Sequence, residues 1–239
     1  MSIRRCVALA LLFASLTATT LHAQEGDFRF GFQASPMITW MGSSEKQVEG
    51  DGANLAFKVG MLGEYYFAEN YAFKGGLNMS FNQGGQQKYQ FVTTNGFALF
   101  PESDLSLDTL NRLPSGTSVR YRFQYVEIPF GLKMRTNEIG YLRYFAEIPL
   151  FTLGVNVNSR ADINVSGVNG EDENISDDVS LLNLSWGFGG GVEYSVSESA
   201  ALVGGIFFQS GFVDVISDDG EDDSKNTLSQ VTLRIGVLF

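Results

Sequence analysis

Carboxylates are the side chains of this 239-residue sequence that could do chemistry. Glu127 and Glu147 stand in two successive segments, and a pair of glutamates can serve a hydrolase as acid and base. Nearby Lys133 and Arg143 would instead hold both glutamates ionised, whereas acid–base catalysis needs one of them protonated. We therefore predict that the protein is not an enzyme.

Two acidic segments, 161–178 and 214–225, suggest a second chemistry, because carboxylates are hard ligands suited to calcium or magnesium. The candidate ligands are Asp218, Asp219, Glu221, Asp222 and Asp223. Their spacing does not match an EF-hand loop, and a run of like charge is usually a solvated loop. We expect no resident cofactor and keep a divalent-cation site here as a hypothesis.

A third set consists of single charges of both signs at alternate positions of otherwise apolar segments. Its members are Arg29, Lys58, Glu64, Lys74, Glu127, Lys133, Arg143, Glu147, Glu193 and Arg234. Charges enclosed in a narrow space must pair, and breaking one pair is costly. Such a set could hold a structure together or could line a polar path for small solutes.

The first 23 residues have the order of a secretory signal peptide. Two arginines precede the uncharged stretch 6–20, and the small residue Ala23 stands before Gln24. The apolar stretch is too short for a transmembrane helix, although it could form an amino-terminal helix of a cytoplasmic protein. We predict that residues 1–23 are cleaved, which leaves 24–239 as one domain.

Cleavage would remove the only cysteine and the only histidine, Cys6 and His22. The remaining chain could form no disulfide, thiolate nucleophile, histidine base or His/Cys zinc site. It would carry 14 basic and 27 acidic residues, whereas nucleic-acid binders are basic. We therefore expect no nucleic-acid partner.

The residues after position 27 alternate between apolar and small or polar types, as β-strands do. Eight segments show this pattern: 28–41, 54–67, 71–82, 125–135, 141–154, 181–194, 200–212 and 228–239. The apolar face carries more aromatic residues than the interior of an eight-stranded barrel can hold, so we place it outside. Segment 200–212 is apolar on both faces, so the sequence does not show which of its residues face inward.

Connections between these segments alternate in length. Turns at 68–70, 136–140 and 195–199 are short, whereas the connections at about 42–51, 83–118, 158–179 and 214–226 are long. This order predicts an all-β, eight-stranded antiparallel up-and-down transmembrane β-barrel with three short periplasmic turns and four long extracellular loops.

The fourth strand is predicted to continue above the membrane through residues 119–125. Tyr121, Phe123 and Tyr125 would then share the lumen-facing side of the strand, unless a bulge reverses the alternation.

Three motifs resemble the PorT-like family of Gram-negative outer-membrane β-barrel proteins. They are YVEIPFGLK at 125–133, GFGGGVEY at 187–194 and the terminal LRIGVLF at 233–239. Ending on Phe239 resembles the signal that the barrel-insertion machinery reads, which implies that machinery and periplasmic chaperones as partners. The best-known member of the family is associated with protein secretion, a role that these motifs alone do not transfer.

The sequence thus predicts a non-enzymatic protein of the Gram-negative outer membrane. It could be an envelope scaffold, a surface-loop binding protein or a secretion or assembly accessory. Expected partners are membrane lipid, lipopolysaccharide and an envelope protein. The alternatives are a narrow solute channel and a secreted, lipocalin-like soluble barrel, which would line its cavity with apolar residues.

Overall fold

The computed structural model describes residues 27–44, 46, 48–90, 116–165, 168–216 and 225–239. The predicted signal peptide and the candidate metal ligands at 218–223 lie outside these residues. The strands are β1 (Asp27–Ser43), β2 (Val48–Ala68), β3 (Tyr71–Tyr89), β4 (Thr117–Arg135), β5 (Leu142–Val165), β6 (Val168–Asn174), β7 (Leu182–Ser195), β8 (Ala201–Gly211) and β9 (Asn226–Leu238). Over the described chain, no helix has the length and apolar character needed to span a membrane.

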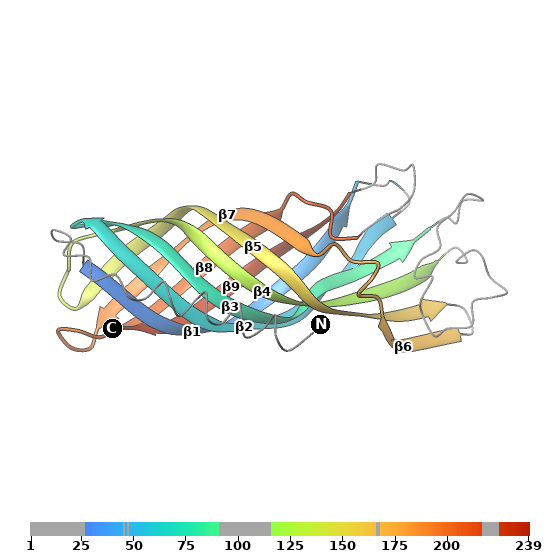
Figure 1. Cartoon of the computed structure of the whole chain (residues 1–239), viewed down its shortest axis with the longest axis horizontal. Helices are drawn as coiled ribbons and strands as arrows, with labels where there is room; N and C mark the ends of the chain where they lie inside the picture. The colour runs from blue at the N-terminus through green and yellow to red at the C-terminus, as the bar shows by residue number, and fades with distance from the viewer. Residues whose placement is uncertain (1–26, 45, 47, 91–115, 166–167, 217–224) are drawn as a thin grey trace, which may run out of the picture.

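Eight of these strands close into one antiparallel ring (Figure 1). The order around the ring is β1, β2, β3, β4, β5, β7, β8 and β9, and β9 pairs with β1 to complete it. Strand β6 pairs with β5 in a hairpin that projects beyond one end of the ring (Figure 1). The predicted eight-stranded antiparallel barrel is therefore confirmed. Closure pairs the backbone around the ring, as lipid surroundings require.

The barrel carries its apolar residues on the outside. Phe28, Phe30 and Phe32 of β1 are between 50% and 63% exposed, whereas Ser35 and Thr39 on the opposite face are fully buried. Alternation along each strand repeats this division around the ring. Because apolar area of this extent needs a lipid environment, the predicted inside-out arrangement is confirmed.

The structure shows which residues of strand β8 face the lumen, a point that the sequence left open. Leu202 and Ile206 face outward, while Val203 and Phe207 are buried in the lumen. The Phe145 and Phe207 rings are stacked, with centroids 6.3 Å apart. Both faces of this strand are apolar because one faces the membrane and the other fills the interior.

The two ends of the barrel differ. At one end, which we call the turn end, the strands connect through short turns at 69–70, 136–141 and 196–200, close to the predicted positions. At the other, the loop end, the predicted long connection over 42–51 is wrong, because β1 continues to Ser43 and β2 begins at Val48. Pairing with β9 extends β1 through Ser43, and pairing with β3 extends β2 back to Val48, whereas β1 and β2 pair with each other only as far as Trp40 and Ala53.

Strand lengths make the loop end asymmetric. Strands β2 to β5 contain 21, 19, 19 and 24 residues, whereas β7, β8 and β9 contain 14, 11 and 13. The wall formed by β2 to β5 is therefore taller and continues past the rest of the barrel (Figure 1).

The register shift in β3 generates one testable prediction. Gly84 follows this shift with a φ of +131°, and a Cβ there would lie 2.3 Å from the carbonyl oxygen of Tyr121. We expect Gly84→Ala to lower the free energy of unfolding by about 1–3 kcal/mol, because backbone cannot easily move away. Urea unfolding in detergent micelles, followed by tryptophan fluorescence, measures this loss.

The matched control is Gly204→Ala, since a Cβ at Gly204 meets nothing within 4 Å. It should change the unfolding free energy by less than about 0.5 kcal/mol. Equal losses in the two variants would show that Gly84 is not constrained in this way.

Candidate functional site

The lumen near the turn end contains a first cluster of ion pairs. Lys133 Nζ donates to Glu64 Oε1 and Oε2 at 2.6 and 2.8 Å and also pairs with Glu193. Arg29 Nη1 lies 3.2 Å from Glu193 Oε2, and the Tyr66 hydroxyl donates to Glu64 Oε2 at 2.8 Å. The cluster joins strands β1, β2, β4 and β7 across the interior.

A second cluster surrounds Glu147 of β5. Its Oε1 accepts a hydrogen bond from Arg234 Nη1 at 2.6 Å and pairs with Lys74. The Arg234 guanidinium lies 3.6 Å from the ring centroid of Phe207, and Lys74 Nζ lies 5.7 Å from it. The ring therefore interacts with both cations as well as filling space between them.

A third cluster lies farther toward the loop end. Lys58 Nζ is 2.5 Å from Glu127 Oε2, and the Gln83 side-chain amide donates to the other carboxylate oxygen. Beside it, Gln209 Nε2 donates to Thr152 Oγ1 at 2.7 Å. Paired charges and amides thus occupy the middle of the lumen.

Nine of the ten alternating charges identified in the sequence belong to these clusters. They are Arg29, Lys58, Glu64, Lys74, Glu127, Lys133, Glu147, Glu193 and Arg234. Arg143 is the exception, and the prediction that it belongs to the internal charge network is wrong. It pairs with Glu138 and donates to Ser195 Oγ at the turn-end rim. It stands only one residue after the start of β5, too near the rim to reach the interior clusters.

The sequence prediction omitted Tyr66 from the internal cluster. Tyr66 is buried and contacts Glu64, two positions earlier on the same face of β2. Alternation alone could have placed it inside, since Tyr65 and Phe67 both face outward.

Glu127 and Glu147 do not form a shared acid–base site. Glu127 lies opposite Gly154 in the β4–β5 register, whereas Glu147 lies opposite Lys133. The two carboxylates have different cation partners. Glu127 pairs with Lys58, and one of the partners of Glu147 is Arg234. Each carboxylate is therefore one side of its own ion pair, and the two lie at different levels of the lumen.

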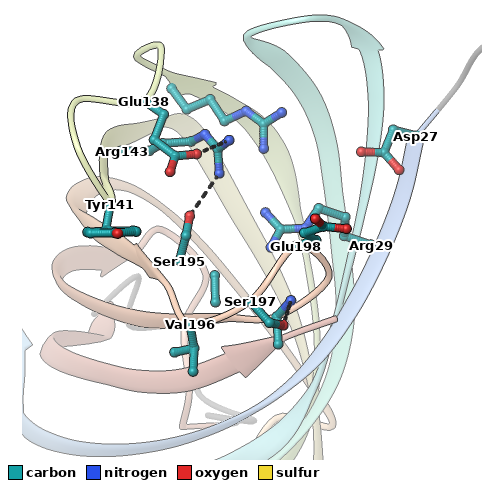
Figure 2. Close-up of a pocket in the computed structure, with 12 residues that line it drawn as sticks. Asp27, Arg29, Glu138, Tyr141, Arg143, Ser195, Val196, Ser197 and Glu198 are labelled. Atoms are coloured by element: carbon teal, nitrogen blue, oxygen red, sulfur yellow. Dashed lines mark hydrogen bonds and ion pairs between the residues drawn. The ribbon is translucent and has the colours of Figure 1, made fainter.

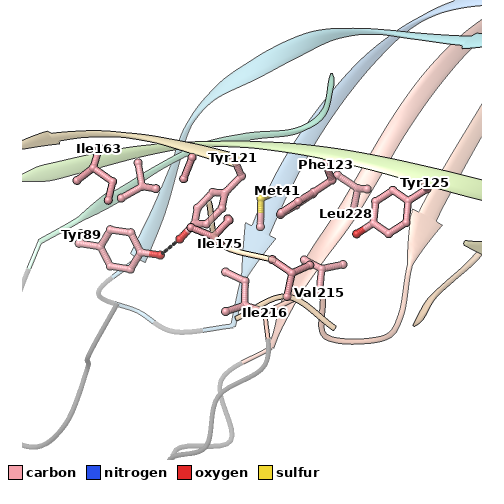
Figure 3. Packing of buried hydrophobic residues seen from close by; sticks show 13 residues of the cluster. Met41, Tyr89, Tyr121, Phe123, Tyr125, Ile163, Ile175, Val215, Ile216 and Leu228 are labelled. Atoms are coloured by element: carbon pink, nitrogen blue, oxygen red, sulfur yellow. Dashed lines mark hydrogen bonds between the residues drawn. The ribbon is translucent and has the colours of Figure 1, made fainter. Parts of the chain in front are cut away.

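An apolar cluster closes the lumen at the loop end (Figure 3). Its members are Met41, Tyr89, Val119, Tyr121, Phe123, Tyr125, Ala161, Ile163, Ile175, Val179, Val215, Ile216 and Leu228. We call this set the apolar cap. Tyr121, Phe123 and Tyr125 face inward as predicted, and the Tyr89 and Tyr121 hydroxyls are 2.6 Å apart.

Two connections fold inward to complete the apolar cap. Residues 175–181 contribute Ile175 and Val179, and the segment after β8 contributes Val215 and Ile216 (Figure 3). Val179 and Ile216 form a β-bridge. The sequence contained no periodic pattern that could have identified these four residues.

Asp214 fixes one of these inward-folded segments. Its Oδ1 accepts backbone N–H groups of Ile216 at 3.0 Å and Asn226 at 3.1 Å. Partial burial raises the pKa of this carboxyl above its usual value, against the opposing effect of these hydrogen bonds. Asp214, part of the acidic segment considered for cations, therefore has a structural role.

A pocket of about 520 Å³ opens at the turn end (Figure 2). It is lined by Asp27, Arg29, Arg135, Glu138, Tyr141, Arg143, Ser195, Val196, Ser197, Glu198, Ala200 and Ala201. The Arg135 guanidinium lies 3.8 Å from the centroid of the Tyr66 ring and donates to the carbonyl oxygen of Glu69.

Arg29 links the pocket to the interior of the barrel. It lines the pocket and pairs with Glu193 of the first ion-pair cluster, whose side chain is fully buried. Farther along, the cavity between Gln83, Tyr125 and Glu127 measures about 10 Å³, which is the space of about one water molecule. Among the described side chains, no group of three or more carboxylate, His or Cys residues is placed to hold a metal ion.

Comparison with known proteins agrees with this architecture. The outer membrane protein beta-barrel domain family matches residues 22–217. No match was found among curated proteins. Solved structures that resemble the chain include Neisserial surface protein A, with 11% identity, a TM-score of 0.46 and coverage of 90% of this chain and 98% of that one.

Two further structures resemble the chain at similar levels. Ail, the attachment invasion locus protein of Yersinia pestis, is 12% identical with a TM-score of 0.37, over 90% of this chain and 100% of that one. The outer membrane protease OmpT of Escherichia coli is 10% identical with a TM-score of 0.41, over 91% and 99%.

The third ion-pair cluster allows a direct test of internal pairing. Lys58→Met leaves the Glu127 carboxylate buried with only the Gln83 amide, and should lower the unfolding free energy by about 3–5 kcal/mol. Adding Glu127→Met should recover at least half of this loss, because the double variant contains no unpaired charge. Urea unfolding in micelles measures both changes.

Lys46→Met serves as the control, because Lys46 is exposed in the connection between β1 and β2. Its change should stay within about 0.5 kcal/mol. If Lys58→Met were equally mild, the internal pairs would not be holding the barrel together.

Proposed function

The chain belongs to the outer membrane protein beta-barrel domain family, and we propose that it is a sealed barrel that anchors a binding surface outside the cell. It is a protein of the Gram-negative outer membrane. In the proposed orientation, the turn end faces the periplasm and the loop end faces the outside of the cell. Known barrels of this kind have short turns on the periplasmic side. A PorT-like secretion or assembly role is a narrower form of the same proposal.

The closed lumen is the observation that supports this function. A solute entering from the turn end would meet Lys133 between Glu64 and Glu193, and then Glu147 between its two cations. Beyond them it would meet the apolar cap. Passage would require separating buried ion pairs and then displacing packed aromatic rings, and both steps are costly.

The alternatives account for fewer observations. A secreted lipocalin-like barrel would line its interior with apolar residues, but here the exposed aromatic residues of β1 and the other strands face outward. A narrow channel requires a continuous polar path, and the apolar cap interrupts it. A non-enzymatic role agrees with the separate placement of Glu127 and Glu147.

As part of this proposal, Phe239 contributes to the outer surface of the barrel beside β1. The Phe239 ring lies 5.6 Å from that of Phe30, and its backbone N–H donates to the Phe30 carbonyl oxygen at 2.7 Å. Phe239 thus stands on the outer surface at the strand pair that closes the barrel.

Conductance measurements test whether the lumen is sealed. The purified protein in planar bilayers should show no stable current steps, and proteoliposomes should not swell in small sugars, whereas an open porin does both. The variant Tyr121→Ala/Phe123→Ala should also stay silent, because the ion-pair clusters below remain. Regular steps in the unmodified protein would favour the channel alternative.

Epitope tags test the orientation. A tag beside Lys46, at the loop end, should be labelled by antibody on intact cells, because this connection faces outward in the proposed orientation. A tag at the 69–70 turn should be labelled only after permeabilisation. The reverse pattern would show that the loop end faces the periplasm.

A further inference from the structure

The turn-end pocket is lined by three arginines and three carboxylates, not all of which neutralise one another. They are Asp27, Arg29, Arg135, Glu138, Arg143 and Glu198. Arg143 pairs with Glu138, and Arg29 pairs with the buried Glu193 behind the pocket. Within the described part of the chain, the remaining guanidinium and the two remaining carboxylates take part in no ion pair.

Arg135 is the guanidinium that lacks a carboxylate partner. It lies 3.8 Å from the centroid of the Tyr66 ring, and its Nε and Nη2 donate to the carbonyl oxygen of Glu69 at 3.4 and 3.2 Å. These contacts fix the group and occupy its Nε edge. The opposite edge, formed by Nη1 and Nη2, is the fork that binds a carboxylate through two parallel hydrogen bonds. Arg135 is therefore preorganised to receive an external carboxylate.

The two carboxylates without an ion pair stand at the rim of the turn-end pocket. Asp27 is the first residue of β1, and Glu198 lies in the turn between β7 and β8. Both lie on the Arg29 side of the pocket, across from Glu138 and Arg143 (Figure 2). A phosphate or a dicarboxylate would meet these two like charges, whereas an ammonium group would pair with them. The turn-end pocket therefore suits a ligand that carries both signs of charge.

The size and walls of the turn-end pocket suit a short length of chain. Its volume of about 520 Å³ falls within the range of about 300–1,000 Å³ that is usual for ligand pockets. Tyr141 and Val196 add exposed apolar surface to the lining. Such surface can pack against the aliphatic part of a long, charged side chain.

We propose that the turn-end pocket binds the carboxy-terminal end of a peptide chain whose last residue is basic. The terminal carboxylate binds the fork of Arg135, and the positive side chain pairs with Asp27 and Glu198. The aliphatic part of that side chain packs against Tyr141 and Val196. This inference goes beyond the sealed-barrel role, since it holds whether or not the lumen conducts. In the proposed orientation the pocket opens to the periplasm, so the peptide comes from there.

Titration of the purified barrel in micelles with acetyl-Ala-Ala-Lys tests the proposal. Two-dimensional NMR of the isotope-labelled protein should show saturable shifts of the backbone amides in the 136–141 and 196–200 turns. The carboxy-terminal amide of this peptide should bind about tenfold more weakly, because it cannot accept the paired hydrogen bonds of Arg135. Replacing its lysine by norleucine should weaken binding about threefold, which is typical of an exposed ion pair.

Three results would overturn the proposal. They are equal binding of the acid and the amide, equal binding of the lysine and norleucine peptides, and no shift in the two turns up to about 10 mM peptide. Free lysine carries the same charged groups without the chain and should bind more weakly than the peptide. Equal binding of lysine would show that the turn-end pocket accepts an amino acid and not a chain end.

Matched variants assign each preference to its own residues. Arg135→Gln should remove the difference between the acid and the amide while keeping the difference between lysine and norleucine. Asp27→Asn/Glu198→Gln should do the reverse. Lys46→Gln, an exposed change at the loop end, should alter neither difference. Equal effects of all three variants would assign binding to net charge and contradict a specific site.

Folding of each variant is checked by its shift on unheated and boiled detergent gels. Arg135→Gln also loses the contact with the Tyr66 ring, so Arg135→Lys serves as a second variant that keeps the positive charge. It should reduce the preference for the acid, because an ammonium group cannot form two parallel hydrogen bonds with a carboxylate. A folded Arg135→Lys variant with the full preference would exclude the fork of Arg135 as the carboxylate receptor.

Discussion

Charge neutrality inside a narrow, lipid-surrounded cylinder is the constraint on which the structure depends. Water cannot solvate charges in so small a space, so each enclosed carboxylate needs a cation within contact distance. The partners come from strands that are not neighbours in the ring, since Lys133 of β4 joins Glu64 of β2 and Glu193 of β7. The ion pairs therefore connect strands that share no backbone hydrogen bonds.

The fold could be predicted from the sequence wherever one face of a strand differed chemically from the other. Strands such as β1 alternate phenylalanine with small or polar residues, so their outward face was evident. Strand β8 could not be oriented, because Phe207 fills the lumen while Phe208 lies outside next to Trp40 and Phe188. The ends of the strands could not be predicted either, since their pairing beyond the membrane involves residues of every type.

The site was predictable as a set of residues and unpredictable as a set of contacts. Alternation identified the internal charges, but their partners depend on the stagger between strands, which no local pattern records. Arg143 shows the limit of prediction from alternation. Alternation correctly placed this residue on the inward face, but its closeness to the rim of the barrel determines its partner, Glu138. The apolar cap escaped prediction because Ile175 and Val215 lie in connections, where packing is decided by tertiary contacts alone.

The unequal strand lengths have a consequence for how the barrel meets its neighbours. Viewed within the membrane plane, the molecule has a high shoulder at β2–β5 and a low one at β7–β9, so its rotation about the bilayer normal is distinguishable from outside. A large complex or a polysaccharide layer above the membrane would come closest to the bilayer over the low shoulder. Among the described strands, the barrel therefore presents its neighbours in the membrane with one tall side and one low side.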